Sequence, residues 1–191
     1  MSAGLDPEEP DVYRLVRVLL GTSVVKGPRP ISGPAALYRV GAEYRIVVSS
    51  KLPPAYQRFY AAHELAHWML REEGLDDRDE AAADYLGAAL LAPRRAFISA
   101  VRNGLDLPTL ADIFGLTETG AALRLGETTG RPIVLVAPAS VRVRGPEEWV
   151  WPPEPTLRTW ARKGRPGLAR TRLVDDPRRV MLESEEREEA G

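Results

Sequence analysis

The sequence predicts an α+β fold with a mainly helical core, a small N-terminal β-hairpin, a helix-turn-helix-like segment and a β-rich C-terminal extension. Apolar residues recur at helical spacing over 55–71, 77–91 and 94–103. Val, Ile and Tyr are frequent in 35–40 and 44–50, which is typical of strands. The chain has 191 residues, of which 44% are hydrophobic, and is therefore long enough to form one or two domains with a buried core.

The N-terminal elements follow from local patterns. A short helix is expected at 11–20, and Gly21 ends it. The sequence Gly41-Ala42-Glu43 separates the two expected strands as the turn of a hairpin. Pro53-Pro54 then precedes the 55–71 helix. The expected buried positions of that helix are Phe59, Ala62, Leu65, Ala66, Met69 and Leu70.

The helix over 77–91 should end at Pro93, and the next helix should end before Gly104. The following segment, 107–125, resembles a helix-turn-helix, in which Gly115 permits the tight turn and Thr117 caps the second helix. Four apolar residues should pack between the two helices: Leu110, Phe114, Leu116 and Leu123.

This helix pair has few side chains that could contact DNA bases. A helix that reads bases presents Arg, Lys, Asn or Gln to base edges, and here only Arg124, near the end of the second helix, has a suitable side chain. A structural role for the pair is therefore favoured over DNA binding.

Both histidines of the chain fall in one string, His63-Glu64-Leu65-Ala66-His67. On a helix, residues four apart lie one above the other, so both imidazoles can face one metal ion with Glu64 beside them. The pattern also occurs by accident on helical surfaces, but random placement puts two histidines four residues apart only about 1% of the time. The string predicts one Zn²⁺ per chain, with Glu64 as the catalytic base that accepts a proton from water.

Two histidines leave a catalytic zinc ion in need of a third protein ligand, and a carboxylate is the usual choice where Cys is absent. Glu80 and Asp84 lie four apart on the next helix. We expect Glu80, which has the longer reach, to bind the metal and Asp84 to orient a ligand histidine. The alternative is that Glu80 merely belongs to a solvated acidic cluster with Glu72, Glu73, Asp76, Asp77 and Asp79.

The string from Glu80 to Pro93, EAAADYLGAALLAP, together with RFYAAHELAH at 58–67, resembles the ImmA/IrrE family of zinc-dependent metallopeptidases. The resemblance covers about 11–130 and implies a zincin-like peptidase domain at 1–104, followed by the helix-turn-helix-like segment at 105–130. It also implies the same ligands, His63, His67 and Glu80, and the same base. The departures from the family pattern remove no ligand: Ala66 replaces Gly, Asp84 replaces Asn and adds a negative charge, Leu86-Gly87 replaces Phe-Ala, and Ala92 replaces Met.

The resemblance further implies the substrate: a helix-turn-helix transcriptional repressor, cut once to release stress or mobile-element genes. Many zinc peptidases also stabilise the oxyanion with a side chain, for which Tyr85, Tyr60 and Tyr56 are the candidates here. The alternative function is a non-hydrolytic regulator that binds DNA or sequesters a repressor. Structural zinc sites usually have four protein ligands, so the open two-His, one-carboxylate set favours catalysis.

The C-terminal part is expected to form a small β-rich basic extension at 131–181 and an acidic disordered tail at 182–191. From 131 to 180 there are eleven Lys and Arg against five Asp and Glu, whereas the last ten residues contain five Glu and one Arg. Strands are expected at 133–137 and 140–144. The aromatic residues of the extension, Trp149, Trp151 and Trp160, either form its small core or, if exposed, stack nucleic-acid bases or grip a partner peptide. If this extension grips a repressor or DNA, deleting the chain from Arg131 onward should leave a folded, zinc-loaded core and should cost recognition rather than chemistry.

The remaining features exclude several classes. The chain has no cysteine, so a disulfide framework and thiolate metal ligands are excluded. The net charge of −1 does not favour a nucleic-acid or membrane partner. No stretch approaches the roughly 18 apolar residues of a membrane span, and a cytoplasmic location is expected.

Overall fold

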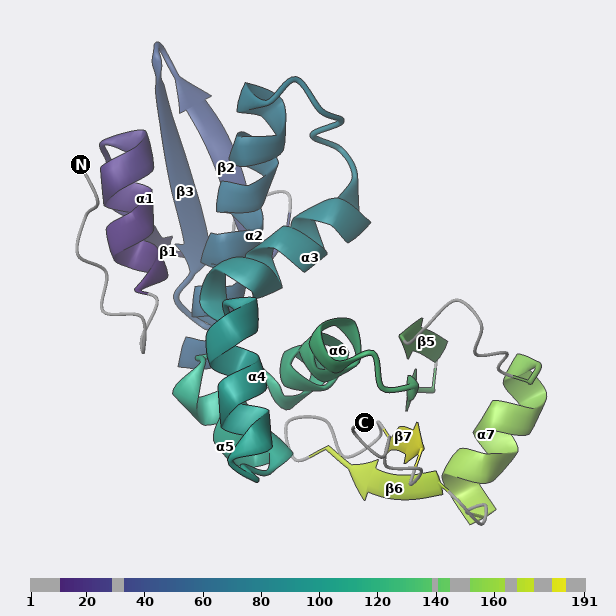
Figure 1. Ribbon diagram of the computed structural model, residues 1–191. Coiled ribbons are helices and arrows are strands. Elements are labelled where there is room, and N and C mark those ends of the chain that lie inside the picture. The colour runs from purple at the N-terminus through teal and green to yellow at the C-terminus, as the bar shows by residue number, and fades with distance from the viewer. Residues whose placement is uncertain are drawn as a thin grey trace.

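The computed structural model describes residues 11–28, 33–138, 141–144, 152–163, 168–173 and 180–184. The N-terminal elements are α1 (Val12–Leu20), β1 (Val25–Gly27), β2 (Ala35–Val40), β3 (Glu43–Ser49), α2 (Pro54–Glu72), α3 (Glu80–Leu91) and α4 (Arg94–Arg102). The later elements are α5 (Leu107–Ile113), α6 (Glu118–Thr129), β4 (Ile133–Val136), β5 (Val141–Arg144), α7 (Glu154–Lys163), β6 (Leu168–Arg172) and β7 (Val180–Ser184). The fold is α+β, as predicted (Figure 1).

The N-terminal sheet has the strand order β1-β3-β2. The predicted hairpin pairs β2 with β3, and Gly41 has a positive φ of 65° in its two-residue loop, a conformation that glycine adopts without strain. Strand β1 was not predicted; it pairs parallel to β3 on the far edge. Strand β2 therefore forms one edge of the sheet. Helix α2 packs against β2 and β3, and α1 also packs against β3.

The predicted helices form where local signals place them, but α3 begins three residues later than expected. Its N-cap is Asp79, whose carboxylate accepts hydrogen bonds of 3.0 Å from the backbone N–H groups of Ala81 and Ala82. Asp77 consequently lies in the α2–α3 connection rather than in the helix. Helices α2 and α3 pack side by side (Figure 1), with Ala66, Leu70 and Ala83 buried between them.

The helix-turn-helix-like segment consists of α5 and α6. Gly115 has φ 62° at the turn, and Thr117 caps α6 by accepting a 3.0 Å hydrogen bond from the Gly120 N–H. Three of the predicted packing residues are buried and Leu123 packs against the same core from a partly buried position. Nine of the twelve residues of α6 are buried, which leaves little helix surface for a groove of DNA.

Arg124, the one predicted base-reading side chain, is only 4% exposed. Its Nε donates a 2.9 Å hydrogen bond to the Ala92 carbonyl, and its guanidinium lies over the Tyr85 ring. Arg124 therefore ties α6 to the end of α3. The structural role that the sequence favoured for this segment fits these contacts.

The extension contains a four-stranded antiparallel sheet in the order β5-β4-β7-β6, with α7 beside it. The two faces of β4 have different partners. Ile133 and Leu135 belong to the main core, whereas Val134 and Val136 pack with Leu157 of α7. The sheet is thus sandwiched between the helical core and α7.

Several expectations for the extension need correction. Helix α7 was not predicted, and Trp160 on it packs against the small second core, while Trp149 and Trp151 lie outside the described residues. The expected tail begins inside β7, because Leu182 is fully buried; residues 185–191 lie outside the described residues.

The structure argues against the prediction that the extension can be deleted without harm to the core. Ile133, Leu135, Leu173 and Met181 belong to the same hydrophobic cluster as the helices of the N-terminal part. Cutting at Arg131 would remove these side chains and expose their partners to water. Separately, none of the helices in the described ranges has both the length and the apolar composition that crossing a membrane requires.

Candidate metal centre

Helices α2 and α3 approach closely at His63, and Gly87 permits this approach. A Cβ at position 87 would lie 3.0 Å from the His63 backbone nitrogen and 3.2 Å from its Cα. Backbone atoms inside a helix cannot move aside as the end of a flexible side chain can. A glycine here therefore sets the helix spacing that brings α3 carboxylates to the α2 histidines.

Three of the predicted residues meet at one point. The Nε2 atoms of His63 and His67 are 2.9 Å apart, as expected for residues one helical turn apart. The Glu80 carboxylate lies 3.3 Å from His63 Nε2 and 3.7 Å from His67 Nε2. Their potential ligand atoms all lie within 4.8 Å of one another.

The other ring nitrogens determine the histidine tautomers. His63 Nδ1 donates to Asp84 Oδ1 at 3.1 Å, and His67 Nδ1 donates to the Asp77 carbonyl at 2.8 Å. A carboxylate and a carbonyl only accept, so both Nδ1 atoms carry the proton. When both imidazoles are neutral, their Nε2 lone pairs face each other, an arrangement that a proton or a metal cation between them stabilises.

The donor set fits zinc. A tetrahedral zinc site with metal–nitrogen distances near 2.0–2.1 Å has ligand–ligand separations of about 3.3–3.4 Å. The observed separations of 2.9, 3.3 and 3.7 Å scatter around that value. Two nitrogens and one oxygen from the protein leave a fourth position for water, which is the pattern of catalytic zinc rather than structural zinc.

Asp84 lies on the far side of the His63 ring from the convergent Nε2 atoms, in the orienting place predicted for it. Burial lowers the pKa of His63. The hydrogen bond from His63 to Asp84 and the negative charges of Asp84, Glu64 and Glu80 outweigh burial, so the pKa of His63 is raised above its usual value. The surroundings of this imidazole thus favour positive charge, which a bound cation also supplies.

Glu64 is half-buried beside the two histidines. Burial raises the pKa of its carboxyl group, although the charges of His63 and His67 and a hydrogen bond with the Leu37 backbone act in the opposite direction. The bond with Leu37 joins the carboxylate to the edge strand β2 and orients it. A carboxylate of raised pKa is a better proton acceptor than a fully solvated one.

The second histidine is held by groups that the sequence did not reveal. The Asp77 carbonyl that accepts from His67 lies in the α2–α3 connection. Arg71 holds this connection: its Nε donates to Asp77 Oδ2 at 2.6 Å, and its guanidinium lies 5.6 Å from the Tyr44 ring centroid. A backbone acceptor cannot be recognised from the sequence. The only available sequence signal was the opposite charge of Arg71 and Asp77, which is compatible with an ion pair between them.

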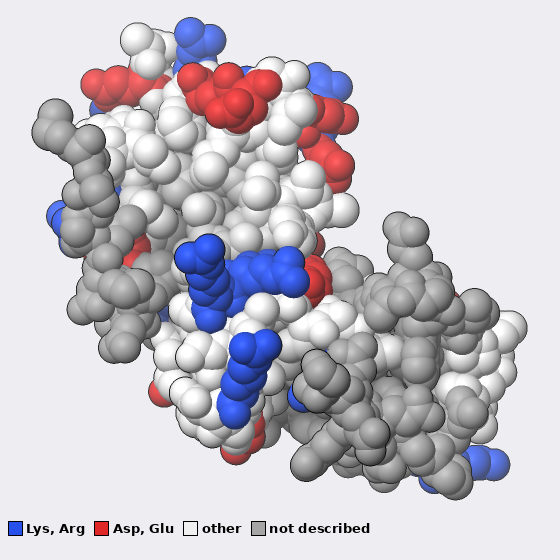
Figure 2. All heavy atoms as spheres, in the orientation of Figure 1, with Lys and Arg blue, Asp and Glu red and all other residues white. Residues whose placement is uncertain are grey.

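Glu80 differs from the acidic residues that precede it. Acidic side chains gather over the end of α2 and the α2–α3 connection (Figure 2), where Glu72, Glu73, Asp76 and Asp79 are exposed. The Glu80 side chain is also 76% exposed, yet it is within reach of both histidines. Its closeness to both histidines favours the role of a metal ligand over that of a merely solvated surface carboxylate.

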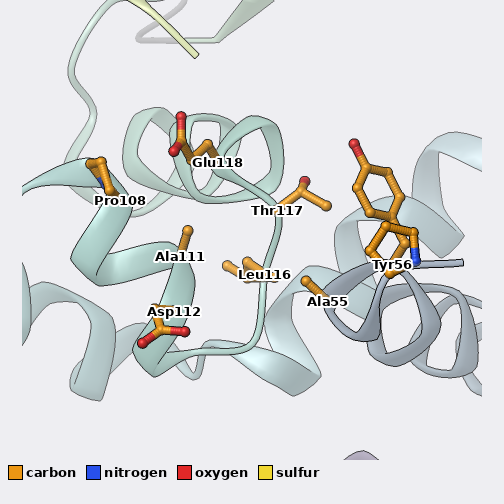
Figure 3. Close-up of a pocket in the computed structure, with 9 residues that line it drawn as sticks. Ala55, Tyr56, Pro108, Ala111, Asp112, Leu116, Thr117 and Glu118 are labelled. Atoms are coloured by element: carbon orange, nitrogen blue, oxygen red, sulfur yellow. The ribbon is translucent and has the colours of Figure 1, made fainter. Parts of the chain in front are cut away.

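The three tyrosines proposed as oxyanion stabilisers lie in different places. The Tyr60 ring packs edge-on against His63, with centroids 6.4 Å apart. Tyr85 is 49% exposed and lies under the guanidinium of Arg124. Tyr56 lines a separate pocket of about 340 Å³ between the start of α2 and α5–α6 (Figure 3). This placement favours Tyr60 over the other two.

We predict that Gly87→Ala destabilises the protein, although alanine is the better helix former. Overpacking costs about 1–3 kcal/mol, which exceeds the gain of about 1 kcal/mol in helix propensity. Urea unfolding followed by circular dichroism measures the change. Ala81→Gly, at an exposed position in the first turn of α3, is the control that changes helix propensity away from the contact with His63. A Gly87→Ala protein more stable than the wild type would contradict the close helix contact.

We also predict different effects for the two α3 carboxylates. Glu80→Gln should weaken zinc binding more than Asp84→Ala, because Glu80 faces both Nε2 atoms while Asp84 acts through His63. Loss of an outer partner typically costs about 10- to 100-fold in metal affinity. Competition with a chelating zinc indicator measures both affinities. If Asp84→Ala lost the metal and Glu80→Gln kept it, the two roles would be exchanged.

Known proteins are similar to this chain over the segment that contains the candidate site. The family model of the IrrE N-terminal-like domain, Peptidase M78, matches residues 27–125, which include α2 and α3. Among solved structures, a Mycobacterium tuberculosis transcriptional regulator is similar in fold, with a TM-score of 0.63 at 17% sequence identity, and the match covers 91% of this chain and 79% of that one. No curated protein matches the chain. The match over more than half of the sequence shows that this chain belongs to the Peptidase M78 family of IrrE N-terminal-like domains.

Proposed function

We propose that the protein is a zinc-dependent endopeptidase that makes a limited cut in a helix-turn-helix transcriptional repressor. The observation that carries this proposal is the open His63, His67 and Glu80 set with Glu64 beside it. The Peptidase M78 family supports the reaction class. A purely structural metal site would not need a free fourth position or an adjacent base.

In this proposal the residues have separate roles. His63, His67 and Glu80 would hold a Zn²⁺ ion, which would supply a water of lowered pKa and a Lewis acid for the peptide carbonyl. Glu64, oriented through the Leu37 backbone, accepts the proton of the attacking water and donates it to the leaving amine. Asp84 and the Asp77 carbonyl keep the two imidazoles in the tautomer that presents Nε2 to the metal.

The substrate class is proposed from context. The solved structure of similar fold carries the name of a transcriptional regulator. In this chain the second helix of the helix-turn-helix-like segment, α6, is largely buried, and its Arg124 is buried too. The name supports a link to transcription, and the burial of the second helix and of Arg124 argues against direct reading of DNA by this helix pair.

Incubating the zinc-loaded protein with the helix-turn-helix repressor encoded beside its gene tests the proposal. We expect two repressor fragments from one cut, identified by mass spectrometry, and no fragments after treatment with a chelator. Casein serves as the unrelated protein that should remain intact. A stable complex with an uncut repressor would instead favour the non-hydrolytic regulator.

A further inference from the structure

One charged residue of the C-terminal sheet reaches the metal site. Arg142 on β5 lies with its Nη1 3.7 Å from Asp84 Oδ2. The other oxygen of the same carboxylate, Oδ1, accepts from His63 Nδ1 at 3.1 Å. Asp84 therefore connects a residue of the extension with a histidine of the candidate metal centre.

The sheet register places Arg142 on this side. Arg142 pairs with Leu135 of β4 in the antiparallel ladder, and directly paired residues lie on the same face of a sheet. Leu135 is only 3% exposed and packs in the main helical core, whereas its neighbours Val134 and Val136 face α7. The same face that anchors the sheet to the core thus carries Arg142 toward α3.

Folding stability does not account for this pair. The side chains of Arg142 and Asp84 are 52% and 37% exposed, and ion pairs at such positions contribute little to stability. The pair instead offsets negative charge, because three carboxylates, those of Glu64, Glu80 and Asp84, lie around the two histidines. A cation on the outer oxygen of Asp84 holds that carboxylate in place with its inner oxygen toward His63.

We propose that Arg142 is a positioning residue of the metal centre, through which the C-terminal sheet sets how firmly His63 is oriented. The residue lies beyond the 27–125 segment that the family model matches, so this contact is supplied by the extension. The inference rests on the metal site of the proposed function and not on the identity of the substrate.

Two opposing effects follow when Arg142 is removed. The loss of a positive charge favours a divalent cation, while the loss of orientation at Asp84 and His63 disfavours it. Salt screens the first effect more than the second, because the guanidinium lies 3.7 Å from Asp84 but is separated from the metal position by that carboxylate and an imidazole. Orientation is therefore the larger effect, and the affinity should fall.

Metal affinity in five variants tests this inference: three single variants, an Asp84→Asn background and the double variant in that background. We expect Arg142→Ala to weaken Zn²⁺ and Co²⁺ binding by about 3- to 10-fold, a fraction of the 10- to 100-fold typical of a direct partner of a ligand histidine. Arg142→Lys should restore part of the loss, because it returns the charge. Arg131→Ala removes one positive charge from the same extension and should have no effect. In an Asp84→Asn background, Arg142→Ala should add nothing, because the carboxylate that it orients is gone.

The visible absorption of bound Co²⁺ gives a second measurement that is independent of peptidase activity. We expect its band positions to shift in Arg142→Ala and not in Arg131→Ala, since only the former changes the orientation of His63. Circular dichroism checks that each variant is folded. Unchanged or tighter metal binding in Arg142→Ala, or an equal loss in the Asp84→Asn background, would overturn the inference. A wild-type protein that binds neither metal would overturn the metal site and the inference together, whereas absence of cleavage would overturn only the peptidase.

Discussion

Glu64→Gln is expected to lower the rate of repressor cleavage by about 10²-fold or more, as is typical for the loss of a general base. Glutamine keeps the size of the side chain and a carbonyl oxygen that accepts a hydrogen bond, but it cannot accept a proton. Because Glu64 is not one of the three converging ligands, zinc content and repressor binding should be unchanged. Quantitative gel assays under single-turnover conditions measure the rate.

Glu72→Gln is the matched control, since Glu72 is an exposed carboxylate at the end of the same helix. The control should cleave at the wild-type rate. The Glu64→Gln protein also separates the enzyme from a binding module in cells. If this variant derepressed the target promoter as well as the wild type does, proteolysis would not be the function.

His63→Ala and His67→Ala are each expected to abolish stoichiometric zinc. Each removes one of three ligands, and the chain has no further histidine and no cysteine to replace it. Zinc that remains on a two-ligand site exchanges with buffer, so elemental analysis after gel filtration should find about one zinc per wild-type chain and almost none in either variant. Cleavage should be lost together with the metal.

Gln57→Ala serves as the control for general damage to α2. Gln57 is buried two turns before His63 and donates a 2.6 Å hydrogen bond to the Leu52 carbonyl. Its loss should lower stability without releasing zinc. If both histidine variants retained wild-type zinc, the assignment of the metal centre would have to be abandoned.

Local sequence signals were enough for much of the helical core. The spacing of His63 and His67 predicts their alignment on any straight helix, so this pair needs no tertiary information. Gly21, Gly115 and Thr117 end or begin helices through backbone geometry and capping that depend only on near neighbours. The start of α3 was less certain, because Asp76, Asp77 and Asp79 are all suitable N-caps and only Asp79 caps the helix.

The surroundings of the site depended on contacts that no local pattern encodes. The backbone groups of Leu37 and Asp77 interact with Glu64 and His67, and backbone groups are the same at every position of a sequence. Nothing in the composition separated Arg142 from the ten other basic residues of the extension.

The sequence alone thus determined the α+β class, the helix that carries both histidines and the carboxylates that could join them as ligands, because these depend on periodicity and on residue types that zinc requires. The tertiary structure decided which carboxylate faces the histidines and which one stands behind His63. It also decided that the extension shares the main core and brings Arg142 to Asp84. Those outcomes follow from the close packing of α2 on α3 at Gly87 and from the register of β5 on β4, which join residues far apart in the chain.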